Sequence, residues 1–506
     1  MNTNVSTTSS KSRESKSREY FFFILWAVII LVTGWKSEGW LQPDEHARVL
    51  EPAHFIAYGY ASLPWELSAH QPIVSWFLGV LVSPILMVTK YLNIEGLGEA
   101  GVVRSCVGLL ASTRFIAIWK IMEMLGLNTT RRSFYLLVMM AAVFGPLFIV
   151  RTSQENFATT ALVWAYFYAL KIRQQSLTKP SGIKFGFLLA LVFSARPQVG
   201  LAAAGLGLWM LKKEGKALII PSALGLFLGL LPMAVVDIFK TGVPFLPVYN
   251  YLNYALGNEG GGALWGTSPW WYYIPQYLES WYPPISVCLI IPIFVGLWNS
   301  PSLASLVTPF VLIHFILGHK ETRYFSPMIP FMQLSMFLGI EWLEQRHAFT
   351  AKITASKKFW IRTLQTVAAL TLIAGLLPFN TSPWMYNELG KRLRNGDFKE
   401  FTYIGNTASS FSQFYAKFPN PPKFNQISWN DVRDGKEAPS GWLAFYALDP
   451  EDFRAIEQSC HAKGLTELPD WMIDFITLFP RSPARRRINT VVFCPQKLVF
   501  VAKNHS

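Results

Sequence analysis

The chain has 506 residues, of which 51% are hydrophobic and 15% are charged, and its mean hydropathy is +0.28. Soluble domains carry roughly 25% charged residues, so this composition excludes an ordinary soluble protein and predicts a polytopic α-helical membrane protein. The net charge of +14 is not accompanied by a DNA- or RNA-binding motif. We expect no nucleic-acid partner, because basic loops on the cytoplasmic side of a membrane account for the excess.

The N-terminal region joins a polar, basic stretch to the first apolar run. Residues 1–19 predict a cytoplasmic tail, and the run over 20–35 lacks a small-residue cleavage site, which favours a retained signal anchor. Ten further apolar runs predict ten to twelve transmembrane helices in a domain over 20–378. They lie near 72–92, 101–124, 133–150, 157–172, 183–211, 217–236, 285–298, 302–318, 324–343 and 359–378.

Basic clusters between these runs predict the orientation of the chain, because short loops rich in Lys and Arg stay on the cytoplasmic side. The clusters are Arg131 with Arg132, 171–184, 212–216 and 346–358. The loops 36–71 and 237–284 then face outward, together with residues 379–506.

Two details of this topology need explanation. The runs 72–92 and 101–124 lie between an outward and an inward loop, which requires an odd number of crossings. One of the two is therefore predicted to be re-entrant or interfacial, or else the segment between them enters the membrane only partway. The run 183–211 is long enough for two short crossings, which we expect to be separated at Arg196-Pro197.

Residues 379–506 have the polarity of an ordinary soluble domain. A strand is predicted at 442–448 and a helix at 450–464, which together favour a mixed α/β domain on the outer face. Cys460 and Cys494 lie in this domain. They can form a disulfide in an oxidising compartment or remain two buried thiols.

The first outward loop contains "WLQPDEHARVLEPAHF", which is rich in ionisable residues. Pro43 of this motif can open a helix with Asp44 and Glu45 in its first turn. Helical spacing predicts that Glu45, Arg48 and Glu51 share one side, with His54 following. The alternative is that the two acidic residues only cap a juxtamembrane helix.

Two further motifs fall on the same predicted face. "VRTSQEN" places Arg151 at the outer end of a span, where it either orients a ligand or only reaches the membrane interface. "HKETR" is predicted to pair Glu321 with Lys320 or Arg323 while His319 stays free, unless it is only a solvated loop.

Acidic and cationic groups that converge at a membrane surface suit chemistry on a lipid-linked phosphate. One carboxylate would accept the proton of an acceptor hydroxyl, and we predict Asp44 for this role with Glu45 as the alternative. Cations would hold the phosphate as its negative charge develops. The donor-phosphate candidates are His319, Lys320, Arg323 and Arg151, and the supporting candidates are Glu321, Glu51, His54 and Asp237. The outward loops lack a D-x-D motif, so no metal or other cofactor is expected.

The motifs resemble those of the family 22 glycosyltransferases of the GT-C superfamily, which includes the GPI and N-glycan mannosyltransferases that use dolichyl-phosphate mannose. "QPDEHARVLEPAHFIAYG" is similar to the first luminal loop of the family, and "HKETRYFSPMIP" to its H-K-E-x-R-F signature. The long loop from Asp237 is similar in its D-x-x-x-x-G and G-x-x-P-W-x-x-Y patterns. "RTSQEN" and "FKTG" depart from the usual R-T-x-S-N and F-Y-G. The resemblance covers residues 20–345.

This resemblance implies a GT-C fold and an inverting mannosyltransferase with a polyprenyl-phosphate mannose donor and a glycolipid or lipid-linked glycan acceptor. Its active site would face the lumen of the endoplasmic reticulum or the periplasm beside a bacterial inner membrane. The aromatic residues Trp270, Trp271 and Tyr272 either stack on a sugar or lie in the membrane interface. The open alternatives are transfer of another polyprenyl-linked sugar, a lipid or glycan transporter, and a non-catalytic scaffold.

Overall fold

The computed structural model describes most of the chain. The described residues are 23–36, 44–67, 71–141, 145–256, 266–281, 285–347, 362, 365–366, 369, 382–397, 400–404, 413–417, 424–448, 450–460 and 488–498. The predicted tail over 1–19 lies outside them, as does most of the run 359–378.

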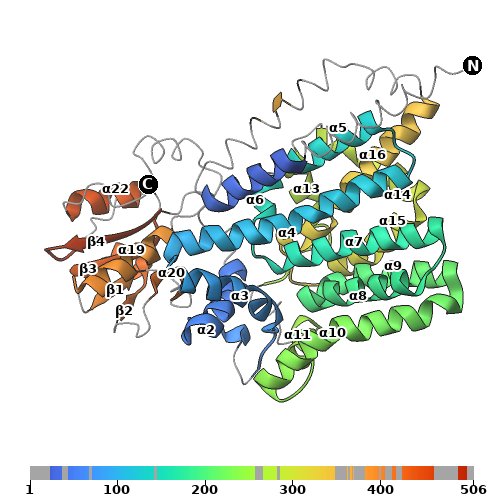
Figure 1. Cartoon of the computed structure of the whole chain (residues 1–506). Helices are drawn as coiled ribbons and strands as arrows, with labels where there is room; N and C mark the ends of the chain where they lie inside the picture. Colours follow the sequence, from blue (N-terminus) through green and yellow to red (C-terminus); the bar gives the residue numbers. More distant parts are fainter. Residues whose placement is uncertain are drawn as a thin grey trace, which may run out of the picture.

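A bundle of helices forms the body of the molecule, and a small sheet domain lies at one end of it (Figure 1). After a first helix, Phe23–Lys36, the α-helices of the body are α2 Glu51–Tyr58, α3 Phe77–Tyr91, α4 Gly96–Met124, α5 Thr129–Ala141, α6 Gly145–Ile149, α7 Gln154–Gln175, α8 Lys179–Ala195, α9 Gly200–Glu214, α10 Ile219–Thr241, α11 Leu246–Leu256, α13 Tyr273–Trp281, α14 Ile285–Asn299, α15 Pro301–Ile316 and α16 Ile329–Arg346. A π-helix, η1 His46–Leu50, and the 3₁₀ turns η2 Trp65–Leu67, η4 Pro197–Val199, η5 Gly215–Leu218 and η6 Thr322–Met328 connect them.

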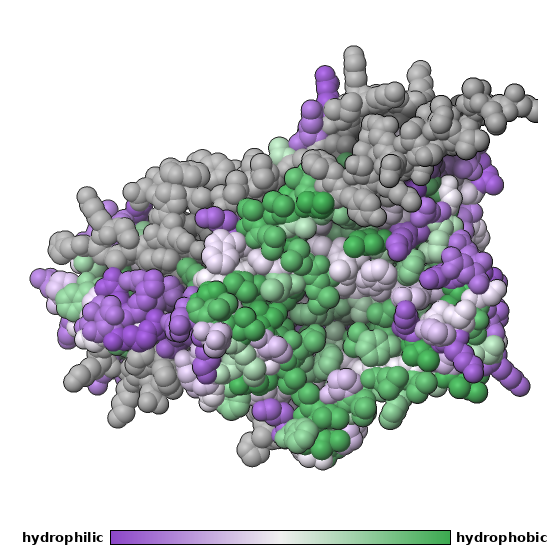
Figure 2. Space-filling model, viewed as in Figure 1, coloured by the Kyte–Doolittle hydropathy of each residue, from purple (hydrophilic) through white to green (hydrophobic). Residues whose placement is uncertain are grey.

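Apolar side chains cover the middle of the bundle, which marks an integral membrane protein. Figure 2 shows them between hydrophilic residues over the sheet domain at the left and hydrophilic residues at the right-hand end. Within the described residues, two helical segments are long and apolar enough to cross a membrane, Gly96–Met124 and Pro197–Thr241, or three if the bent pair Cys288–Asn299 and Pro301–Ile316 counts as one span. The expected number of ten to twelve spans stays a prediction.

The second of these segments contains a break. Its 45 residues would extend about 68 Å as one helix, more than twice the ~30 Å hydrocarbon core. Gly215 adopts φ +65°, where α9 ends and η5 begins, and α10 follows. α10 packs along α8 and α9 packs along α15, so the segment provides two separate elements of the bundle.

Helix α3 lies along α2. Gly79 lies so close to α2 that an added Cβ would be 2.6 Å from Pro52, and at the other end of α3 the Lys90 Nζ donates to the carbonyl of Ala57, 2.8 Å away. The eight residues of α2 extend only about 12 Å and cannot cross a membrane. That one of the runs 72–92 and 101–124 is re-entrant or interfacial stays a prediction.

The predicted break at Arg196-Pro197 is confirmed. α8 ends at Ala195, Arg196 is extended at φ −153° and ψ 100°, and the short turn η4 begins at Pro197. A residue before proline is driven out of the helical region, and proline lacks the N–H that would continue the helix. The break therefore places the Arg196 side chain at the end of a helix.

The C-terminal region is a mixed α/β domain, as the sequence predicts. Its strands β1 Phe401–Ile404, β2 Phe424–Ile427, β3 Gly441–Leu448 and β4 Ile488–Cys494 form a sheet in the order β2-β1-β3-β4. β1 is parallel to β2 and β3, whereas β3 and β4 are antiparallel. Helices α19 Ser382–Asn395, α20 Gln413–Ala416, α21 Trp429–Arg433 and α22 Pro450–Ser459 accompany it. The predicted strand is β3, the predicted helix is α22, and the Cys460–Cys494 disulfide forms.

This domain packs against the first outward loop and the start of α4 (Figure 1). The Tyr415 hydroxyl accepts a hydrogen bond from Arg104 at 2.9 Å, and Lys417 forms a buried ion pair with Glu99. Glu99 also accepts hydrogen bonds from Thr89 and Tyr58 at 2.7 and 2.9 Å. A chain of buried polar contacts therefore joins the two domains on the side of the first loop.

Candidate active site

An ion-pair cluster forms where three irregular segments meet. Asp44 lies just before the π-helix η1, Arg323 lies in η6, and Arg196 lies in the break after α8. The Asp44 carboxylate is 2.5 Å from Arg323 Nη1 and 2.8 Å from Arg48 Nη1. The structure thus brings the first outward loop into direct contact with the "HKETR" motif, as the predicted topology requires. We call Asp44, Arg48, Glu155, Arg196, Glu321 and Arg323 the charge cluster.

Glu321 is the central acceptor of the "HKETR" motif. Its carboxylate is 2.7 Å from Arg323 Nε and also accepts from Arg323 Nη2 and the Tyr324 hydroxyl, each at 2.9 Å. The predicted Glu321–Arg323 pair is confirmed. The prediction that His319 stays free is wrong, because its Nε2 lies 3.2 Å from Glu321 and its Nδ1 lies 3.3 Å from the carbonyl of Gly266. The turn η6 begins directly after Glu321, which brings its carboxylate close to these neighbours.

Lys320 points away from the charge cluster. Its side chain is buried, and Nζ donates to the carbonyls of Ser268, at 3.1 Å, and Leu317. Ser268 donates its own N–H to the carbonyl of Gly318 at 2.9 Å. Lys320 therefore attaches the long outward loop to the end of α15, a contact that its place in the motif did not predict.

Arg196 and Glu155 belong to the charge cluster, although the sequence motifs did not predict them as site residues. Arg196 Nη2 is 3.1 Å from Glu155, Nη1 donates to Gln154 at 2.8 Å, and the guanidinium carbon lies 5.4 Å from the centre of the Tyr324 ring. Glu155 is in the first turn of α7, which Ser153 caps by accepting the N–H of Asn156. The signal for Arg196 was present in the sequence, since the proline that follows it predicts that a helix ends at this cation.

The two candidate bases differ in accessibility. The Asp44 side chain is 25% exposed, whereas Glu45 is only 5% exposed and its backbone carbonyl accepts from the Thr152 hydroxyl at 3.1 Å. Burial raises the pKa of Asp44, but Arg48 and Arg323 outweigh burial and hold the pKa below its usual value. Asp44 is therefore ionised at neutral pH and can be reached by a substrate.

Arg151 lies behind the charge cluster rather than in it. It is 1% exposed, and its Nε donates to the carbonyl of Leu147 at 3.2 Å. Burial lowers its pKa to about 10, against the opposing effect of the Glu45 carboxylate. Its place is next to Glu45, so direct contact with a donor phosphate would require rearrangement of the loop.

Arg48 pairs with Asp44, four positions before it, and, at 3.1 Å, with Glu66. It lies in the π-helix η1, whose i→i+5 hydrogen bonds depart from the α-helical spacing on which the predicted alignment of Glu45, Arg48 and Glu51 rests. That alignment stays a prediction. Such turns are frequent at functional sites.

Glu51 and His54 are structural in this arrangement. The two carboxylate oxygens of Glu51 accept the backbone N–H groups of Ser62 and Phe414 at 3.0 and 3.2 Å. His54 is buried, with Nδ1 2.9 Å from the carbonyl of Tyr60. Both residues hold the C-terminal domain against the first loop, and the structure does not place them in the charge cluster.

The remaining candidates lie in the long outward loop and the helix before it. Asp237, near the end of α10, is buried and accepts a hydrogen bond from the Ser75 hydroxyl at 2.6 Å, which ties α10 to the segment before α3. Trp270 and Trp271 are 65% and 49% exposed, and Tyr272 is half-buried. Their contact with a sugar or with the membrane interface stays a prediction.

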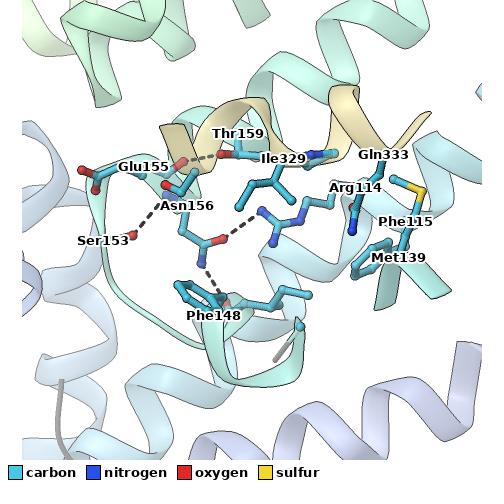
Figure 3. Close-up of a pocket in the computed structure, with 14 residues that line it drawn as sticks. Arg114, Phe115, Met139, Phe148, Ser153, Glu155, Asn156, Thr159, Ile329 and Gln333 are labelled. Carbon is cyan, nitrogen blue, oxygen red and sulfur yellow. Dashed lines mark hydrogen bonds between the residues drawn. The ribbon is translucent and has the colours of Figure 1, made fainter. Parts of the chain in front are cut away.

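A small cavity lies on the other side of the first turn of α7 (Figure 3). Glu155 and Asn156 are neighbours in sequence, yet in Figure 3 the Glu155 carboxylate points away from Arg114 while the Asn156 amide meets it. Asn156 accepts from Arg114 of α4 at 3.0 Å. The cavity therefore adjoins the charge cluster but faces a different cation.

Residues 20–407 match the family model of the Alg9-like mannosyltransferases, and the chain belongs to this family. It is 24% identical over 329 residues to GPI mannosyltransferase 3 of Yarrowia lipolytica, with 63% of this chain and 61% of that protein covered. It is 22% identical over 355 residues to the alpha-1,2-mannosyltransferase ALG9 of Homo sapiens, with 67% and 57% covered. The chain thus spans about 60% of the length of these curated relatives.

The fold is also similar to that of a solved membrane enzyme. The crystal structure of ArnT from Cupriavidus metallidurans bound to undecaprenyl phosphate matches with a TM-score of 0.55 and 11% identity, over 94% of this chain and 98% of that one. This match confirms the predicted GT-C fold.

Proposed function

We propose that this protein is an inverting glycosyltransferase that moves mannose from a polyprenyl-phosphate donor to a hydroxyl of a membrane glycolipid or lipid-linked glycan. The observation that carries the proposal is the 2.5 Å contact between Asp44 and Arg323, which unites a candidate base with a candidate phosphate ligand. Membership of the Alg9-like mannosyltransferase family supports mannose as the sugar. The undecaprenyl phosphate bound by the ArnT structure supports a polyprenyl-phosphate ligand for this fold.

In the proposed reaction the acceptor oxygen attacks the anomeric carbon of the donor. A new carbon–oxygen bond forms on one face of the sugar, the bond to the donor phosphate breaks on the other, and its electron pair stays on the phosphate oxygen. Asp44 accepts the proton of the acceptor hydroxyl. Arg323, supported by His319, stabilises the charge that develops on the phosphate. No step requires a metal.

Asp44 and Arg323 have to separate when the substrates bind. Inversion places the attacking and leaving groups on opposite faces of the sugar, and the two carboxylates of inverting glycosidases stand roughly 6.5–9.5 Å apart for this reason. We propose that the donor phosphate takes the edge of Arg323 that now faces Asp44. Glu321 would keep Arg323 in place, and Arg48 would keep Asp44 in place. Donor binding would then release the base.

The proposed orientation puts this reaction on the luminal or periplasmic side, in the endoplasmic reticulum membrane or a bacterial inner membrane. It is supported by the opposite end of the bundle, where basic clusters meet acidic helix ends. There Arg131 pairs with Glu341 and Glu344, and Arg173 pairs with Glu214. Basic residues in short loops favour the cytoplasmic side, so the charge cluster would face outward.

The test is mannose transfer in isolated membranes supplied with polyprenyl-phosphate [14C]mannose and extracted lipids. Asp44→Asn should lower the initial rate by about 10²–10⁴-fold, because the amide cannot accept the proton. The matched control is Asp431→Asn, in a half-exposed surface pair with Lys436 of the C-terminal domain. Equal rates for Asp44→Asn and wild type would contradict the base assignment. If only a donor that carries another sugar labels the product, the transferred sugar is that one and not mannose.

A further inference from the structure

Arg114 is a buried cation that the proposed reaction does not use. It lies in the middle of the membrane-crossing helix α4 and is 8% exposed. A charged residue at such a place is costly and tends to mark a functional site. Its Nη1 donates to Asn156 Oδ1 at 3.0 Å, and among the described residues no carboxylate forms an ion pair with it. Most of its five N–H donors are therefore available.

The cavity beside Arg114 has a polar end and an apolar wall. It has a volume of ≈ 80 Å³, several times the roughly 10–15 Å³ that one water requires. Gln333 also belongs to the polar end, and it is buried without a hydrogen-bond partner among the described residues. The other polar residues that line the cavity are Ser153, Glu155, Asn156, Thr159 and Ser326. The apolar wall is formed by Phe115, Met139, Phe148, Ile149, Ile329 and Pro330.

Asn156 satisfies only one of the donors of Arg114. Both hydrogens of its amide are already donated, to the carbonyls of Ile149 and Arg151 at 2.7 and 2.8 Å. The amide therefore supplies Arg114 with one neutral acceptor and leaves its positive charge uncompensated. Glu155 also lines the cavity, but its carboxylate pairs with Arg196 at 3.1 Å and points away from Arg114 in Figure 3. The cavity consequently favours an anion.

We propose that this cavity binds the phosphoryl group of a lipid phosphate, with Arg114 and Gln333 as donors. The apolar wall would take the first part of the hydrocarbon chain, and Phe148, 38% exposed, gives this wall an edge on the apolar surface. The inference rests on the proposed function, which requires two lipid-linked substrates. With the donor phosphate at Arg323, the cavity provides a second lipid-phosphate site across one helical turn, for the acceptor lipid.

The test uses a short-chain prenyl phosphate that carries a diazirine beside the phosphate, with the purified full-length protein in detergent. Photolabelled peptides are mapped by mass spectrometry. We expect label on Met139, Phe148 and Ile149, which line the cavity. Arg114→Gln should raise the half-saturating concentration of this labelling by about 10–100-fold, because a charge-assisted bond is lost. Arg114→Lys should retain part of it. Arg131→Gln is the matched control, since it removes an arginine from α5 at the opposite end of the bundle.

The possible outcomes distinguish a lipid phosphate from inorganic phosphate. They also distinguish failure of the cavity proposal from failure of the proposed function. The corresponding prenol should label these lining residues at least about tenfold more weakly, and inorganic phosphate should not displace the lipid at equal concentration. Displacement by inorganic phosphate alone would overturn the lipid assignment. Unchanged labelling in a folded Arg114→Gln protein, judged by gel filtration, would overturn the site. Mannose transfer without this labelling defeats only the cavity, whereas labelling without transfer defeats only the proposed function.

Discussion

Two ion-pair clusters occupy opposite ends of the helical bundle, and their supports differ. At one end, Arg131 of α5 is 2.5 and 2.6 Å from Glu341 and Glu344, which both belong to the regular helix α16. At the other end, Asp44 lies just before the π-turn η1 and Arg323 lies in the 3₁₀ turn η6. Partners held by one regular helix stay at a fixed separation, whereas partners on two separate irregular segments can move apart. The first cluster therefore fastens two helices, and the second can exchange partners.

The ion-pair partners of Asp44 and Arg323 support the conclusion that this pair can open. Asp44 contacts Arg48 as well as Arg323, and Arg323 contacts Glu321 as well as Asp44. If the contact between Asp44 and Arg323 opens, each residue keeps one opposite charge. A buried charge left without a partner is strongly destabilising, so this redundancy lowers the cost of opening the site for a substrate.

Removing one arginine from each cluster gives the largest expected contrast. Arg323→Gln should lower mannose transfer by about 10²–10³-fold, because it removes a cation that stabilises the departing phosphate. Arg131→Gln should change transfer by less than about threefold, since its partially exposed pairs contribute only about 0–1 kcal/mol each to folding. The measurement is the initial rate in membranes normalised to folded protein. Similar losses in both variants would show that the two clusters do not differ in function.

A smaller expected effect is the pH dependence of folding stability near the charge cluster. Burial lowers the pKa of His46, beside Asp44, to about 4, against the opposing effect of Asp44. Because the pKa lies below its unfolded value of 6.5, stability should be complete above pH 6.5 and should decline toward pH 4, by up to about 1.4 kcal/mol per pH unit.

This pH dependence can be measured as the midpoint of thermal unfolding in detergent between pH 7.5 and 4.5. His46→Gln should flatten the decline, whereas His347→Gln, at an exposed position after α16, should leave it unchanged. If His46→Gln and wild type show the same slope, the burial of a neutral His46 does not contribute to acid sensitivity.

The smallest expected effect is that of metal removal. The proposed reaction stabilises the phosphate with arginine and histidine, so pretreatment with EDTA should change mannose transfer by less than about twofold. A large loss that Mg²⁺ or Mn²⁺ restores would show that the cations of the charge cluster are insufficient. That result would also remove the functional difference between the two ends of the bundle, since side chains alone would then not provide the site.

Sequence reasoning succeeded where the physical rule is local. Proline at position 197 predicted the break in the helix, and the short apolar run "WLAFYAL" predicted β3. The π-turn around Arg48 could not be predicted, because it has no distinctive composition. The acceptor role of Glu51 could not be predicted either, because it depends on Phe414, 363 positions further along the chain. Arg114 had no signal in the sequence beyond a charge within an apolar run.

The contacts of the C-terminal domain have a consequence for biosynthesis. Glu51 and Glu99 emerge from the ribosome more than 300 residues before Phe414 and Lys417, the partners that satisfy them. A chain released before residue 413 would leave two carboxylates of the first loop and α4 without these partners. The first loop, which carries Asp44, therefore acquires these contacts only after the last domain has been synthesised. A product truncated before residue 413 should lack them.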